Sequence, residues 1–147
     1  MDSTPLESLS LLDEPGKIVK ISSSSSTAYY VSTRDPDNFL FLRARGTGTT
    51  GVGPTDNEWM PLLDLTSYGL ADDGSLDDGD VIKWTLRVGA RHEYVYDLNS
   101  RYDGWWIQRT CTAIELLDQM PAEGEWANEE TEVPPGTPHD YRNDPAT

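Results

Sequence analysis

The stretch DVIKWTLRV, residues 80–88, decides the fold class because its apolar and polar residues alternate. A period of two residues predicts an extended strand with one buried face and one solvated face. The predicted buried face carries the apolar side chains Ile82, Trp84, Leu86 and Val88. After a Gly-Ala pair, the run HEYVYDL at residues 92–98 repeats the alternation, so the two segments predict a β-hairpin.

Further short apolar runs, separated by turn residues, extend this pattern along the chain. They cover residues 17–21, 27–33, 39–45 and 105–112. Residues 113–118 fit either a continuation of the last run or a helical turn. Helical periodicity is weak, and six or seven short strands predict an all-β fold, a single small antiparallel β-sandwich or barrel.

The composition divides the chain into an N-terminal arm at residues 1–15, a β-domain at 16–118 and a C-terminal arm at 119–147. TPLE, from residue 4, is a capping-box pattern, and leucines spaced by three follow it. This first arm is therefore expected to be extended or to form a short helix over residues 5–12. The second arm is acidic and rich in proline, so we expect it to be disordered or extended unless it is partnered.

A chain of 147 residues predicts one domain with a modest core. No apolar run approaches the roughly 20 residues of a membrane span. The first residues contain neither a basic group nor an apolar signal core, so no secretory signal is predicted. With Cys111 as the single cysteine there is no internal disulfide framework. These features favour a location in the cytoplasm or in a virus particle.

The net charge of −15 is concentrated in three places. Residues 1–15 hold four acids and no base, and residues 119–147 hold seven acids and one base. Five of the fifteen acids of the β-domain lie between residues 72 and 80, and the remaining ten match its ten bases. The scarcity of Lys also fits a halophilic source. A negative chain without a basic cluster excludes direct binding of nucleic acid.

The run RARGTGTTGVGP, residues 43–54, contains the spacing of a dinucleotide-binding turn, Gly46-x-Gly48-x-x-Gly51. That motif needs a helix behind its last glycine. Turn residues follow here instead, so we interpret the run as a loop between antiparallel strands.

The acidic run at residues 72–80 invites a calcium interpretation because Ca²⁺ prefers carboxylate oxygens. The weak candidate ligands are Asp73, Asp77, Asp78 and Asp80. The spacing of an EF-hand fails, however, since the glycine stands one residue late and no Glu occupies the twelfth position. A solvated acidic turn is the preferred interpretation, and we expect no bound cofactor.

Nucleophilic catalysis would have to combine Cys111 with His92 or His139. A lone cysteine in an apolar strand is more typical of a buried residue than of a thiolate. We expect His92 to be exposed beside a turn and His139 to lie in the C-terminal arm. Two histidines and one cysteine are also too few for a structural zinc site. No catalytic residue is predicted.

Aromatic and leucine side chains are the predicted contacts with partners. Consecutive residues of a strand point to opposite faces, so either Trp105 or Trp106 should face outward. Trp and Tyr commonly dominate protein interfaces. The predicted partner-binding residues are Leu6, Leu9 and Leu12 in the first arm, Tyr102, Trp105 and Trp106 in the β-domain, and Trp126 in the second arm.

Three functions remain open from the sequence. The leading hypothesis is a non-catalytic structural or interaction protein, a small subunit of an assembly such as a virus capsid, head–tail connector or tail, with arms that order on neighbouring subunits. The second is an acidic inhibitor that mimics nucleic acid and binds a basic partner. The third is a carbohydrate-binding β-domain that uses the aromatic residues at positions 102–106.

Overall fold

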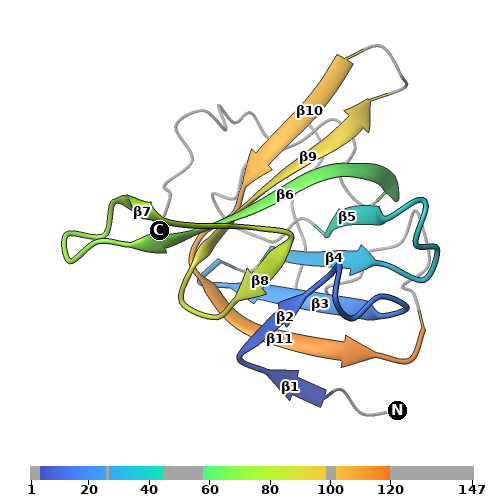
Figure 1. The fold of residues 1–147 in the computed structure, drawn as a ribbon, viewed down its shortest axis with the longest axis horizontal. Helices are drawn as coiled ribbons and strands as arrows, with labels where there is room; N and C mark the ends of the chain where they lie inside the picture. The colour runs from blue at the N-terminus through green and yellow to red at the C-terminus, as the bar shows by residue number, and fades with distance from the viewer. Residues whose placement is uncertain (1–3, 26, 45–57, 99–101, 120–147) are drawn as a thin grey trace, which may run out of the picture.

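The structure is a computed structural model that describes residues 4–25, 27–44, 58–98 and 102–119 (Figure 1). These residues form strands and turns, and none of them is helical. The strands are β1 (Thr4–Leu6), β2 (Ser8–Ser10), β3 (Ile18–Ser23), β4 (Ala28–Ser32), β5 (Leu40–Ala44), β6 (Met60–Leu70), β7 (Leu76–Lys83), β8 (Thr85–Arg87), β9 (Arg91–Leu98), β10 (Tyr102–Ile107) and β11 (Cys111–Leu117).

Nine of the described strands form one antiparallel sheet in the order β1-β11-β3-β4-β5-β6-β9-β10, with β7 paired to β6 outside this path. The other two strands, β2 and β8, form a separate two-stranded ribbon. The predicted all-β antiparallel class is therefore confirmed. The barrel alternative is wrong, because β1 and β10 end the sheet and do not pair with each other.

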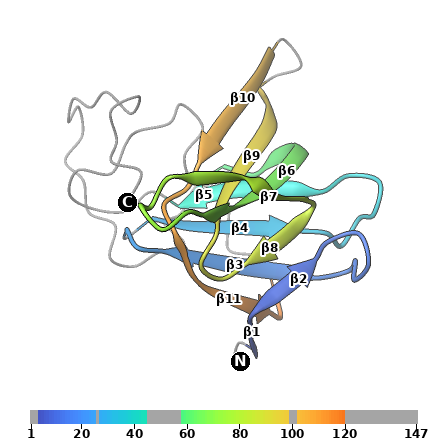
Figure 2. The ribbon, with the colours of Figure 1, turned by 60° about the vertical axis from the view of Figure 1, so that its left-hand side comes forward.

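The sheet bends back on itself because a short connection joins strands from its two ends. Only Gln108–Thr110 separates β10, at one end of the sheet, from β11, near the other end (Figures 1 and 2). At this connection the amide of Cys111 donates to the carbonyl of Ala90 at 2.8 Å, and its carbonyl accepts from Gly89 at 2.8 Å. Backbone hydrogen bonds therefore hold the start of β11 to the segment before β9.

The core lies between the two halves of this bent sheet. Its buried members come from β3, β4, β5 and β11 on one side and from β6, β9 and β10 on the other. The ring of Tyr94 stacks on Phe41 with centroids 4.5 Å apart and on Tyr29 at 5.3 Å, so aromatic contacts span the halves. Full burial of such a side chain contributes about 1.5–3 kcal/mol.

The β2–β8 ribbon covers this core. Leu9 of β2 pairs with Leu86 of β8, and both side chains are buried together with Leu11. The helix predicted over residues 5–12 is wrong, and the extended alternative holds for β1 and β2. A helix of two turns is marginal alone, whereas pairing with β11 and β8 satisfies the backbone and buries leucine at the same time.

Residues 80–88, which predicted the fold class as one strand, include residues of two strands, β7 and β8. Trp84 separates β7 from β8 and has a φ of 56°, in the left-handed region that bulky residues rarely adopt. The change of direction buries Leu86 but leaves Ile82 and Val88 exposed, so the predicted apolar face is only partly formed.

The predicted hairpin between residues 80–88 and 92–98 is also wrong. The β9 strand pairs with β6 and β10, and β8 pairs with β2. The sequence interpretation had missed β6, an eleven-residue strand that pairs with β9 along one edge and with β5 and then β7 along the other. Residues 113–118, left open between strand and helix, belong to β11 as far as Leu117.

Replacing Leu86 by alanine tests the role of the ribbon in covering the core. We expect the Leu86→Ala variant to lower the free energy of unfolding by about 2–5 kcal/mol, because the side chain is fully buried. Leu12→Ala is the matched control, since Leu12 is 59% exposed. Urea unfolding measures both variants. Equal stabilities of the two would contradict the placement of the ribbon.

Candidate interaction surfaces

The β6–β7 hairpin extends beyond the other strands of the molecule (Figure 1). Its turn is closed by the amide of Ala71 donating to the carbonyl of Ser75 at 2.8 Å, with Gly74 at a φ of 87°. Along β7 most residues are exposed on both faces, and they include the apolar residues Val81 and Ile82 at 42% and 40%. The hairpin therefore offers apolar surface on opposite sides.

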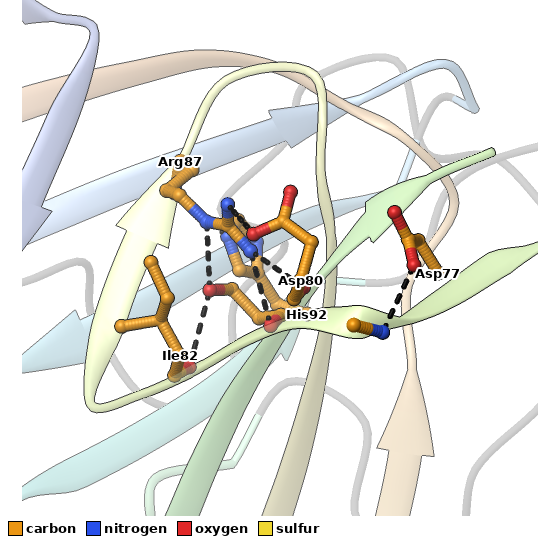
Figure 3. Close-up of polar contacts among 7 residues, drawn as sticks. Asp77, Asp80, Ile82, Arg87 and His92 are labelled. Atoms are coloured by element: carbon orange, nitrogen blue, oxygen red, sulfur yellow. Dashed lines mark hydrogen bonds and ion pairs between the residues drawn. The ribbon is translucent and has the colours of Figure 1, made fainter.

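The acidic residues of the hairpin engage nearby backbone and side-chain donors. Asp73 accepts hydrogen bonds from the hydroxyl and amide of Ser75, which lower the pKa of its carboxyl group. Asp77 accepts from the amide of Gly79 at 2.9 Å (Figure 3). The preferred interpretation of residues 72–80 as one acidic turn needs correction, since the turn ends at Ser75 and β7 begins at Leu76.

The weak calcium candidates are not gathered around one point. Among the described residues, no three His, Cys, Asp or Glu side chains form a group that could hold a metal ion. Asp73, Asp77, Asp78 and Asp80 are spread from the turn along β7, and Asp80 forms an ion pair with Arg87 at 2.8 Å.

Arg87 fixes the base of the hairpin to the ribbon (Figure 3). Its guanidinium group donates from Nη1 to Asp80, from Nε to the hydroxyl of Ser67 at 3.0 Å, and from Nη2 to the carbonyls of Ser67 and Asp80 at 3.2 Å each. Gly69 of β6 leaves room for the carboxylate of Asp80, because a Cβ atom added at Gly69 would lie 2.0 Å from Oδ2 of Asp80. One side chain thus connects β6, β7 and β8.

His92 lies behind Arg87 and is fully buried, so the expectation that it is exposed is wrong. Its Nε2 accepts a hydrogen bond from the amide of Arg87 at 2.9 Å, which places the ring proton on Nδ1. Nδ1 then donates to Oε1 of Gln108 at 2.8 Å, and the same oxygen accepts from the hydroxyl of Tyr94. Burial lowers the pKa of His92 to about 4, against a hydrogen bond to Gln108 that raises it.

Cys111 is buried, as predicted. Burial raises the pKa of its thiol to about 12, so the sulfur stays protonated at neutral pH. Nε2 of His92 bonds to the amide of Arg87, and Nδ1 bonds to Gln108. The ring of His92 is therefore engaged by groups other than Cys111, whose Sγ donates to the carbonyl of Ala113 at 3.7 Å. His139 lies outside the described residues.

The two tryptophans of β10 point to opposite faces, as the strand alternation predicts. Trp106 is 7% exposed and joins the core, where the guanidinium group of Arg43 lies 3.7 Å from the centroid of its ring. Trp105 is 61% exposed on the outer face. Of this pair, only Trp105 is accessible to a partner.

Carboxylates surround Trp105 on the outer face of β9 and β10. Asp103 is exposed two residues before it and pairs with Asp97 across the strands. Val95 lies directly opposite Trp105, and Glu93 lies opposite Ile107, where it accepts from the hydroxyl of Tyr68 at 3.1 Å. Burial raises the pKa of Tyr68, and this hydrogen bond raises it further.

The remaining predicted partner contacts have different positions. Leu9 is buried in the core, and Leu6 is half-buried against it. Leu12 is exposed. Tyr102 begins β10 opposite Leu98. Residues 120–147 of the C-terminal arm, which include Trp126, and the glycine-rich run at residues 46–53 lie outside the described residues.

Comparison of the chain with protein-family models, curated proteins and solved structures found no match. In the described part of the chain, no helix has the length and hydropathy needed to cross a membrane. The interaction surfaces therefore have to be interpreted from their own chemistry. The roles of Arg87, Ser67 and Gln108 were not predicted from the sequence, where the signal for Arg87 is its place on the polar side of an alternating run.

The buried histidine predicts a specific loss of stability in acid. Between pH 6.5 and pH 4 the unfolded chain takes up a proton at His92 and the folded chain does not, so the free energy of unfolding falls as the pH drops through this window. At about 1.4 kcal/mol per pKa unit, the loss is about 3 kcal/mol.

The His92→Gln variant is the control, because glutamine can still accept from the amide of Arg87 and does not titrate. Urea unfolding at several pH values should show the stability difference between the native protein and this variant shrinking from pH 7 to pH 4. A difference that is constant across this range would contradict the buried neutral ring.

Proposed function

We propose that the protein is a non-catalytic structural or interaction subunit that binds other protein chains, including copies of itself, through the β6–β7 hairpin. The observation that carries this proposal is the exposure of β7 on both faces, with Val81 and Ile82 on opposite sides. Val81 and Ile82 lie where β6 also pairs with β9, so they belong to an edge strand of the sheet. An edge strand with exposed apolar side chains is a template for contact with another chain.

The way the hairpin is held supports this role. Arg87 fixes its base at Asp80 and Ser67, so the tip is presented from a rigid body rather than from a loose loop. A preorganised element loses less conformational entropy when a partner covers it. Projecting hairpins of this kind suit subunits of repeating assemblies, and a capsid, connector or tail component of a virus particle is the form that we propose.

The fold also suits a rigid body that presents such contacts. We infer that the bent sheet is a β-sandwich in which β6 belongs to both layers. One layer holds β1, β11, β3, β4 and β5, and the other holds β7, β9 and β10. Core residues from the two layers meet in one cluster, which favours a rigid body that carries the hairpin at its side.

The second candidate function is an acidic mimic that binds a basic partner. The observation that favours it is the position of Asp72, Asp73, Asp77 and Asp78, which are exposed near the tip of the projecting hairpin. Salt distinguishes the two functions, because binding through carboxylates weakens with ionic strength. Association through Val81 and Ile82 strengthens when the repulsion between chains of charge −15 is screened.

Self-association in salt tests the leading function. Sedimentation velocity of the full chain should show larger species at about 1 M salt than at about 0.1 M, since the Debye length falls from about 10 Å to about 3 Å. The double variant Val81→Ser/Ile82→Ser should remain monomeric, because it removes apolar surface from both faces of the hairpin without changing its charge.

The matched control is Leu12→Ser/Val88→Ser, which removes two exposed apolar side chains outside the hairpin. It should associate like the native protein. A native protein that stays monomeric at high concentration in about 1 M salt, or a hairpin variant that associates as strongly, would overturn the proposal.

A further inference from the structure

The β10 strand ends the sheet, and in the described part of the chain no strand pairs with its outer edge, which we call the open edge. Among the described residues it pairs only with β9, over its full length from Tyr102 to Ile107. In an antiparallel pair, alternate residues direct their amide and carbonyl groups away from the partner strand. An edge strand of this length is a template for another extended chain.

Trp105 marks the outer face of this edge. It has the largest exposed fraction among the described large apolar residues, at 61%, and Val95 lies beside it on β9. The next residue, Trp106, is fixed in the core, so the backbone that carries the exposed indole is rigid. A rigid, exposed aromatic ring is a ready contact for the flat or cationic group of a ligand.

The charged residues near Trp105 indicate the charge of the group that binds there. Asp103 lies on the same face of β10, and Asp97 lies opposite it on β9. The strand YDGWWI contains no basic residue. Lys83, on the same side of the sheet, forms an ion pair with Asp64. Asp103 thus places an exposed carboxylate beside the edge of β10, and it complements a positive group of a bound segment.

We propose that the open edge of β10 accepts an extended segment of a protein partner that carries Lys or Arg, with one basic side chain over Trp105 and beside Asp103. The main chain of the segment pairs with the edge, as in recognition by strand addition. A cation over the face of a tryptophan is attracted by the ring, and the neighbouring carboxylate adds to the attraction. A second copy is disfavoured at low salt because each chain carries −15. This surface is separate from the hairpin and does not depend on self-association there.

A labelled peptide that alternates Arg and Thr tests the proposal in the full chain. Fluorescence anisotropy should show binding that weakens as salt rises, the opposite direction to self-association through the hairpin. A peptide that alternates Glu and Thr should not bind. The Arg–Thr peptide with N-methyl groups on alternate residues should bind much more weakly, because it lacks the amide donors for strand pairing.

Substitutions locate the site. We expect Trp105→Ala to weaken binding roughly fivefold, the size of a cation–π contact at an exposed position, and Trp105→Tyr to retain most of the affinity. Asp103→Asn should weaken it roughly threefold, as for an exposed ion pair. Asp77→Asn removes the same charge from the hairpin and should leave the affinity unchanged.

Four results would overturn the proposal. Equal weakening by Asp77→Asn and Asp103→Asn would show attraction to the overall charge rather than to this face. Full affinity of the N-methylated peptide would exclude strand addition. An unchanged affinity in Trp105→Ala would remove the indole from the site. Binding of an oligosaccharide through Trp105, with no binding of the peptide, would assign this face to carbohydrate instead.

Discussion

A buried hydrogen-bond network joins β8 and β9 to the short connection between β10 and β11, and both candidate surfaces lie beside it. Gln108 lies in the short connection between β10 and β11 and is fully buried, so its polar groups need partners within the protein. The side chain of Gln108 accepts from His92 and Tyr94, its amide donates to the carbonyl of His92 at 2.9 Å, and its carbonyl accepts from Nε of Arg91 at 2.7 Å. A buried polar network favours the arrangement that pairs its members, because an unpaired polar atom is costly. Nε2 of Gln108 is such an atom, since it is buried without a hydrogen-bond partner among the described residues. The other nitrogen of His92 holds the amide of Arg87, so the same network extends to the base of the β6–β7 hairpin.

The fold class followed from local patterns, whereas strand pairing did not. Alternation or short apolar runs located β3, β4, β5 and β9, because these strands bury one or both faces. The β6 strand was missed since it contains Pro61 and Gly69, which ordinarily mark turns. Pro61 pairs with Leu40, the first residue of β5, and Gly69 leaves space for the side chain of Asp80. The break at Trp84 was also invisible, because nothing local requires a tryptophan to adopt a positive φ.

Some features of the candidate surfaces could likewise be predicted from local sequence patterns, and others could not. The opposite orientations of Trp105 and Trp106 follow from strand geometry alone and were predictable. The leucines of the first arm were misplaced because their spacing of three residues favours a helix, while long-range pairing with β8 and β11 decided their structure. The roles of Arg87 and His92 depend on residues up to twenty positions away, so no spacing rule could identify them. Charge segregation indicated the acidic hairpin, but its projection from the body depends on the partner strand β6.

The protonation state of the His92 ring tests the buried network most directly. Long-range proton–nitrogen NMR correlations of the full chain report which ring nitrogen carries the proton and at what pH the ring becomes charged. The hydrogen bonds predict a neutral ring with its proton on Nδ1 and a bare Nε2, persisting in the folded protein below pH 6.5. A proton on Nε2, or a ring that becomes charged near pH 6.5 while the chain stays folded, would contradict the network that links β9 to the connection after β10 and to the base of the hairpin.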